Sequence, residues 1–88
     1  MLTAAERRVL KARAHKLEPV VQIGARGLTE EVVGEIERAL HAHELIKVRA
    51  GGLEREERDA VLKDILGRTG AAQVQQVGKV FVIYRKNP

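Results

Sequence analysis

The segment that decides the fold is residues 20–31, Val-Val-Gln-Ile-Gly-Ala-Arg-Gly-Leu-Thr-Glu-Glu. It predicts an apolar strand, a four-residue glycine loop and the first turn of a helix. Glycine lacks a Cβ, so Gly24 and Gly27 would let a ligand approach the backbone and would permit positive φ. The helix offers unpaired N–H groups and the positive end of its dipole, and Arg26 adds a forked cation. The segment therefore predicts a phosphate site, with an ordinary turn as the alternative.

A helix is predicted before this segment. Thr3 and Glu6 match the capping box, in which each side chain meets the backbone N–H of the other residue. The helix should run from about Ala4 to Lys16, and Pro19 ends it because the residue before a proline is pushed out of the α region. Its predicted apolar stripe is narrow and consists of Val9, Leu10, Ala14 and Leu17.

Two more helices are predicted further along the chain. Thr29 is the expected N-cap of the second helix. Its apolar residues recur at helical spacing, at Val32, Val33, Ile36, Ala39 and Leu40. The third helix should run from about Glu54 to Arg68, and Gly70 suits the left-handed conformation that often follows a helix. The third helix should bury Val61, Leu62, Ile65 and Leu66.

The first two predicted strands flank the second helix. Residues 20–23 are apolar apart from Gln22, which favours an interior strand of a sheet. Residues 45–50 alternate between charged and apolar from Lys47 onward, so Lys47 and Arg49 should share one face. Because a helix connects these two strands, they should be parallel with a right-handed crossover.

The last two strands are predicted to form a hairpin. Residues 72–77 and 80–85 are joined by Gly78 and Lys79, which fit a two-residue turn with glycine first. The element order is then α-β-α-β-α-β-β, which gives an α/β fold with a small four-stranded mixed sheet and helices packed on it.

Length and composition favour one small domain over residues 1–88. The chain has no cysteine, so disulfides and thiolate chemistry are excluded. No run approaches the length of a membrane helix and the N-terminus lacks the apolar core of a signal peptide. These features lead us to expect a cytoplasmic monomer that does not associate with membranes.

Positive charge is concentrated in the first helix. The formal net charge is +4, which weakly favours a polyanionic partner. Against the single acid Glu6, the first helix carries Arg7, Arg8, Lys11, Arg13 and Lys16. The second and third helices carry most of the acids. Such segregation favours a basic binding face over a uniformly solvated surface.

Catalytic and metal-binding patterns are weak. Serine and cysteine are absent, and Thr3 and Thr29 are assigned to helix ends. His41, His43 and Glu44 lie close together in sequence, but no third cluster accompanies them, and a polar helix end with histidines near the negative dipole is favoured. We therefore predict no enzyme, no metal and no cofactor.

The remaining candidate chemistry is nucleic-acid binding. Stacking platforms are nearly missing, because Phe81 and Tyr84 are the only aromatic residues. Capture of the backbone remains possible, since a GxxG loop at a helix start holds the sugar-phosphate chain in the KH module.

The chain resembles a known family in several blocks. Residues 14–24, Ala-His-Lys-Leu-Glu-Pro-Val-Val-Gln-Ile-Gly, and residues 27–29, Gly-Leu-Thr, resemble the opening of a CRM domain of the YhbY-like RNA-binding family. Residues 43–48 resemble its second block. Residues 76–79 and 84–85 resemble its closing hairpin. The blocks occur in the family's order over nearly the whole chain, and the chain is similar to a stand-alone bacterial member.

The resemblance implies a fold and a function. CRM domains are RNA-binding modules related in fold to the C-terminal domain of translation initiation factor three, and stand-alone bacterial members are associated with precursors of the large ribosomal subunit. The family's GxxG loop maps onto residues 24–27. This chain departs from the family at Glu18, where lysine is common, and at Ala25, where a basic or polar residue is common, so the local phosphate field is weaker.

The leading hypothesis is a non-enzymatic protein that binds rRNA precursors in large-subunit assembly. Its predicted RNA-binding residues are Gly24, Ala25, Arg26, Gly27, Lys11, Lys16, Lys47 and Arg85. One alternative is a protein-interaction module that docks its basic face on an acidic partner. A small enzyme acting on a phosphate-bearing substrate is the other.

Overall fold

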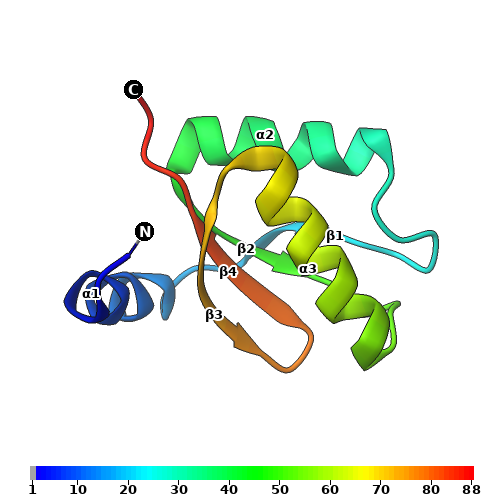
Figure 1. The fold of residues 1–88 in the computed structure, drawn as a ribbon, viewed down its shortest axis with the longest axis horizontal. Helices are drawn as coiled ribbons and strands as arrows, with labels where there is room; N and C mark the ends of the chain where they lie inside the picture. The colour runs from blue at the N-terminus through cyan, green and yellow to red at the C-terminus, as the bar shows by residue number, and fades with distance from the viewer. Residues whose placement is uncertain (1) are drawn as a thin grey trace.

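A computed structural model describes residues 2–88, and Figure 1 shows the path of the chain. The elements follow the order α-β-α-β-α-β-β, as predicted. They are α1 (Ala4–Ala14), β1 (Pro19–Gln22), α2 (Glu30–His43), β2 (Leu45–Arg49), α3 (Arg55–Thr69), β3 (Ala72–Val77) and β4 (Val80–Tyr84). The predicted α/β fold with a four-stranded mixed sheet is confirmed.

The sheet has the strand order β1-β2-β4-β3. β1 pairs with β2 in parallel, while β4 pairs antiparallel with both β2 and β3. The prediction of β1 as an interior strand is wrong, because β1 lies at the edge of the sheet. Val21 is buried whereas Val20 is 52% exposed, so only one face of this strand is covered. The interior strands are β2 and β4, and β4 carries apolar residues on both faces.

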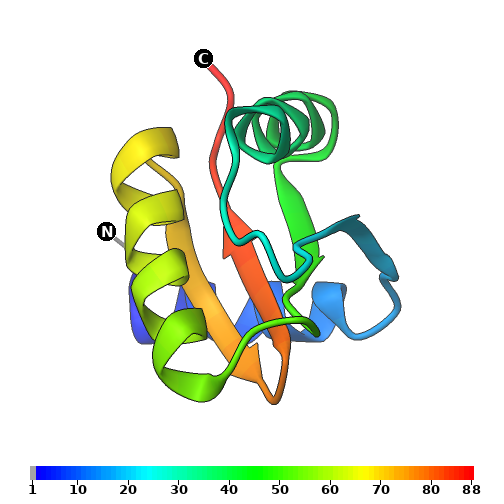
Figure 2. The same ribbon diagram turned by 90° about the vertical axis from the view of Figure 1, so that its right-hand side faces the viewer.

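Helices α2 and α3 cover one face of the sheet (Figure 2). They enclose the larger core, in which Ile36 of α2 and Ile65 of α3 pack with Val48 and Phe81 of the central strands. All four side chains are almost completely buried. Burial of this kind provides roughly 1.5 to 3 kcal/mol per large apolar side chain, so this layer is the main source of stability.

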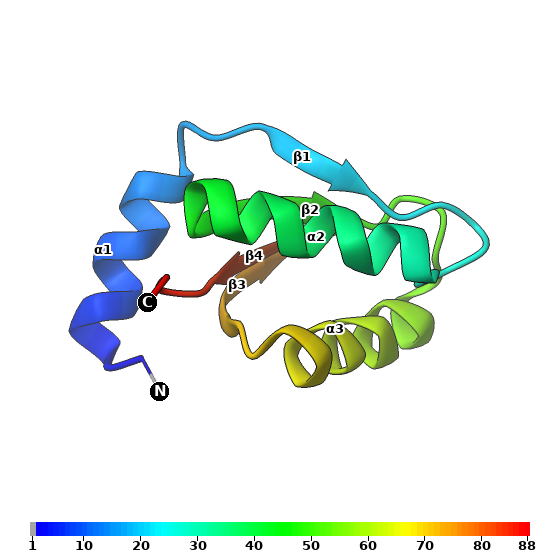
Figure 3. The same cartoon turned by 90° about the horizontal axis from the view of Figure 1, so that it is seen from above.

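Helix α1 lies on the opposite face, at one end of the sheet (Figure 3). Leu10 and Ala14 pack there with Leu45, Val74 and Val82 in a second, smaller core. The apolar stripe predicted for this helix included two residues, Val9 and Leu17, that are exposed. The exposed fractions are 59% for Val9 and 38% for Leu17. The helix also ends at Ala14 instead of Lys16, and a short helix resting on the end of a sheet contacts it through few side chains.

The helix termini follow their sequence signals. Thr3 and Glu6 form the predicted capping box: the Thr3 N–H donates to Glu6 Oε1 over 2.8 Å, and the Glu6 N–H donates to Thr3 Oγ1 over 3.0 Å. Gly70 adopts a φ of 74° after α3. Glu44 ends α2 with a φ of 63°, the only positive φ of a non-glycine residue within residues 2–88. None of the helices in the described chain has the length and apolar character to cross a membrane.

Candidate nucleic-acid interface

The glycine loop, residues 24–27, projects between β1 and α2 at one end of the molecule (Figure 1). The Gly27 N–H donates to the Gly24 carbonyl oxygen over 3.0 Å, which closes a tight turn. Gly27 has a φ of 76°, a conformation that side-chain-bearing residues adopt at a cost. A hollow of about 300 Å³ lies between this loop and the first turn of α2, lined also by Thr29 and Glu31.

The N-terminus of α2 leaves donors unused beside this hollow. The Val32 N–H donates to Thr29 Oγ1 over 3.2 Å, which confirms Thr29 as the N-cap. The Val33 N–H makes the first main-chain bond of the helix, to the Thr29 carbonyl. The N–H groups of Glu30 and Glu31 precede that bond and have no acceptor within the helix. The positive end of the dipole of α2 therefore lies beside the hollow, which Thr29, Glu31 and Val32 line.

The charges around the hollow have different surroundings. Arg26 is exposed and forms no ion pair within residues 2–88. The Glu30 carboxylate is bound to Arg68 of α3, with 3.0 Å between Oε1 and Nη1. This hydrogen bond, together with the charges of Asp64 and Glu30, raises the pKa of Arg68. Glu31 also lines the hollow, and its negative charge disfavours an anion nearby.

Gly52 supports the glycine loop from the segment after β2, a role that the sequence did not suggest. A Cβ at Gly52 would lie 2.8 Å from the Ala25 nitrogen and 2.9 Å from the Gly24 carbonyl carbon. Real Cβ atoms essentially never approach backbone so closely, so only glycine fits. By contrast, a Cβ at Gly24 would meet no atom within 4 Å. The Gly51-Gly52 pair was the available signal, but its contact with residues 24–25 depends on the folded structure.

Two predicted cations lie on the α1 face of the sheet, away from the hollow. Lys11 of α1 and Lys47 of β2 line an open groove of about 620 Å³ that we call the sheet groove. Its lining also includes His15, Arg49, Gln75 and Val77. Lys47 and Arg49 therefore share one face of β2, as predicted. Lys16 is exposed just beyond the end of α1.

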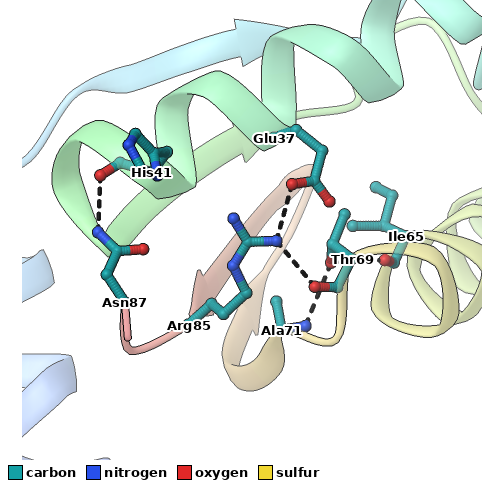
Figure 4. A network of polar contacts seen from close by, with 7 residues as sticks. All are labelled: Glu37, His41, Ile65, Thr69, Ala71, Arg85 and Asn87. Carbon is teal, nitrogen blue, oxygen red and sulfur yellow. Dashed lines mark hydrogen bonds and ion pairs between the residues drawn. The ribbon is translucent and has the colours of Figure 1, made fainter.

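Arg85 lies at the far end of the sheet in a polar network (Figure 4). Its Nη1 donates to Glu37 Oε2 over 2.8 Å and to the Thr69 carbonyl over 2.9 Å. The Thr69 hydroxyl donates to the Ile65 carbonyl and accepts from the Ala71 N–H. The Arg85 side chain is only 24% exposed. It therefore ties α2 to the end of α3, and the structure does not bring it together with the glycine loop.

The histidines at the end of α2 take no part in a metal cluster. The His41 carbonyl accepts a hydrogen bond from the Asn87 amide over 2.7 Å (Figure 4). No group of three or more potential metal ligands gathers anywhere in residues 2–88.

Comparisons with known proteins agree with this architecture. The model of the CRS1/YhbY (CRM) domain matches residues 2–85. An RNA-binding protein of Haemophilus influenzae is 48% identical over 84 residues, which cover 96% of this chain and 85% of that protein. A probable RNA-binding protein of Pseudomonas aeruginosa is 42% identical over 87 residues, covering 99% of this chain and 84% of the relative.

A solved structure shows the same fold. The solution structure of a hypothetical protein of Staphylococcus aureus matches with a TM-score of 0.86 and 32% identity, over 100% of this chain and 92% of that one. The family match spans nearly all of the chain and both curated relatives carry RNA-binding names. The chain therefore belongs to the CRS1/YhbY (CRM) domain family.

Proposed function

We propose that this protein binds RNA by capturing the sugar-phosphate backbone at the glycine loop. The observation that carries the proposal is the hollow lined by residues 24–27 and by Glu31 of the first turn of α2. Arg26 is exposed there and forms no ion pair within residues 2–88, and the first-turn N–H groups of α2 have no acceptor within the helix. Helix N-termini of this kind are favourable sites for phosphate. The names of the relatives support RNA as the source of that phosphate.

The binding mode follows from the chemistry of the hollow. A phosphate oxygen accepts hydrogen bonds from the first-turn amides, and the Arg26 guanidinium neutralises the remaining charge. The absence of side chains at Gly24 and Gly27 lets the ribose approach the loop. Base stacking contributes little, because Phe81 is fully buried in the core and Tyr84 packs in the α1 layer. Phosphate contacts position without reading sequence, so RNA shape provides most of the selectivity.

We infer that the RNA is a precursor of large-subunit rRNA, that the protein acts without catalysis and that it works as a cytoplasmic monomer. The resemblance of its sequence blocks to stand-alone bacterial CRM proteins supports this assignment. The predicted domain spans residues 1–88. Arg85 is left out of the proposed contacts, because Glu37 and Thr69 already occupy its guanidinium.

Gly24 is the position at which to test the loop. An aspartate at Gly27 would combine backbone strain with added charge, since φ is positive there. Gly24 has neither a positive φ nor a nearby atom that a Cβ would touch. Gly24→Ala adds a Cβ alone, and Gly24→Asp adds a Cβ that carries a negatively charged carboxylate. Gly67→Asp on α3 is the matched control, because a Cβ at Gly67 also meets nothing within 4 Å.

The experiment is a fluorescence titration against structured fragments of large-subunit rRNA at two salt concentrations. We expect wild type and Gly67→Asp to bind with strong salt dependence, because binding releases counterions. Gly24→Asp should bind at least tenfold more weakly, with Gly24→Ala in between, and Arg26→Ala should lower both affinity and salt dependence. Equal binding by Gly24→Asp and Gly67→Asp would exclude the loop as the site. No binding by wild type at low salt would favour an acidic protein partner instead.

A further inference from the structure

The sheet groove is a second exposed surface whose construction the glycine loop does not explain. Helix α1 covers one end of this face and leaves two cross-strand rows open. Strand pairing aligns one row as Pro19, Lys47, Val82 and Gln75. It aligns the next as Arg49, Val80 and Val77. All seven residues line the groove, and the C-terminal half of α1 forms its wall.

The groove carries an excess of positive charge. Lys11 stands on the α1 wall, and Lys47 and Arg49 rise from β2. None of the three takes part in an ion pair within residues 2–88. Among residues 2–88, Glu18 is the single carboxylate in the lining. Three cations that lack carboxylate partners in one concave surface favour a polyanion over a neutral or cationic partner.

Exposed apolar side chains lie between the cations of the groove. Val77 is 56% exposed there, and Val80 and Leu17 add further hydrocarbon surface. Single-stranded nucleic acid matches this combination, because it presents both charged phosphates and accessible base faces. A duplex hides its base faces in the helix and offers mainly backbone and 2′-hydroxyl groups. The volume of about 620 Å³ is that of a site for one drug-sized molecule, so it holds one or two nucleotides.

Arg49 connects the groove with the glycine loop. Its carbonyl accepts a hydrogen bond from the Ile23 N–H over 2.7 Å, directly before Gly24. Its Nε lies 3.4 Å from the position of a Cβ on Gly51, and the adjacent Gly52 packs against the loop backbone. A strand bound at the loop therefore has a cationic route past Arg49 to Lys47 and Lys11.

We propose that the sheet groove binds an unpaired RNA segment that continues from the nucleotide held at the glycine loop, with Arg49 as the junction. This inference rests on the proposed function and extends it to the class of RNA. The preferred ligand is a strand long enough to reach both surfaces. Phosphates lie near Lys11, Lys47 and Arg49, and base faces rest on Val77 and Val80.

The test uses single-stranded oligoribonucleotides of about four and about twelve nucleotides, a range that covers typical single-strand site sizes. The test variant is Lys47→Gln/Arg49→Gln in the full chain. The matched control is Arg38→Gln/Lys63→Gln, which removes two exposed charges from α2 and α3. Thermal unfolding checks that both variants fold as wild type does.

We expect wild type and the control to bind the long strand at least tenfold more tightly than the short one. The groove variant should lose that gain while binding the short strand unchanged. For the long strand, the slope of log affinity against log salt should be smaller in magnitude than that of wild type by about 1.4. This is the value expected for two lost phosphate contacts to a single strand.

Four results would overturn the proposal. Equal losses in the groove variant and the control would show a general charge effect. Equal losses for short and long strands would place Lys47 and Arg49 in the primary site. If wild type bound the short and the long strand equally well, the groove would be unused. The proposed function would still stand in that case if Gly24→Asp abolished binding of the short strand. If wild type bound neither strand nor structured rRNA, both proposals would fail together.

Discussion

Arg26 and Arg85 stand at opposite ends of the sheet in different surroundings. Arg26 lies on an exposed loop that follows β1, and no carboxylate in residues 2–88 pairs with it. Arg85 follows β4, where Glu37 and the Thr69 carbonyl accept its hydrogen bonds. One end of the molecule keeps donors open to a ligand, and the other uses its donors to join helices. Both arginines carry the same charge, so their neighbours decide which of them is free to bind a ligand.

The largest effect should follow from adding a side chain at Gly52, which packs against the backbone of the glycine loop. Gly52→Val would force side-chain atoms against the backbone of Gly24 and Ala25. We expect the free energy of unfolding to fall by about 1 to 3 kcal/mol, as in other overpacked sites, and RNA affinity to fall at least tenfold because the loop moves. Gly51→Ala is the control, since its Cβ would meet only Arg49 Nε at 3.4 Å. Denaturation measures the free energy of unfolding, and RNA titration measures the affinity. If Gly52→Val bound RNA as tightly as wild type does, RNA binding would not depend on the position of the loop.

Exchanging the two arginines for alanine should produce opposite results. Arg85→Ala removes a partly buried ion pair and a hydrogen bond to the end of α3, so we expect a loss of about 1 to 2 kcal/mol in unfolding free energy. RNA affinity of the folded fraction should not change. Arg26→Ala should weaken RNA binding and leave stability within about 0.5 kcal/mol of wild type. Weakened RNA binding by folded Arg85→Ala would mean that both ends contact the ligand.

A smaller effect is expected from Glu31, which lines the hollow. Glu31→Gln removes a negative charge beside the proposed phosphate, so RNA affinity should rise about two- to fivefold at low salt and less at high salt. Glu35→Gln, one turn further along α2 and outside the hollow's lining, is the control. A titration at two salt concentrations gives both values. An unchanged affinity in Glu31→Gln would place the phosphate outside the hollow.

The smallest effect is expected at low pH, where the N-terminus of α1, far from the glycine loop, should lose stability. Hydrogen bonds from the backbone and side chain of Thr3 lower the pKa of Glu6 below its ordinary value. A carboxylate with a lowered pKa in the folded state stabilises the fold above its unfolded pKa of about 4.3, and this contribution is lost as pH falls through the folded pKa. The protection factors of the α1 amides, in which each exchange rate is corrected for the intrinsic rate at that pH, should therefore fall below about pH 4.3 in wild type. Glu6→Gln should lack this acid-induced step, and an identical step in that variant would assign it to another group.

Local signals in the sequence were sufficient to predict the element order and most helix ends, although α1 ends at Ala14 and not at Lys16. Thr3, Glu6, Thr29 and Gly70 each act within a few residues of their own position, so their roles follow from spacing alone. The hairpin around Gly78 is equally local, and Gly78 has the positive φ that its turn requires. The glycine loop itself was identified from the sequence because strand, loop and helix start are contiguous.

Several features that depend on distant segments were not predicted. A run of four residues does not reveal that β1 has a neighbour on only one side, so its edge position appeared only in the sheet. The packing of Gly52 against residues 24–25 and the use of Arg85 by Glu37 both join parts of the chain far apart in sequence. The sheet groove also arises from strand register, which places Lys47 and Arg49 beside the α1 wall.

The position of β4 has a consequence for how the protein is made. This strand is one of the two interior strands of the sheet, yet its residues 80–84 are the last of the strands to be synthesised. At ordinary rates of translation a few seconds separate the completion of β2 from that of β4. During this time Ile46 and Val48 have no antiparallel neighbour to cover their strand edge, so the nascent chain is open to aggregation. Folding of this domain should therefore be largely a single late event, and chaperones should meet it before residue 84 appears.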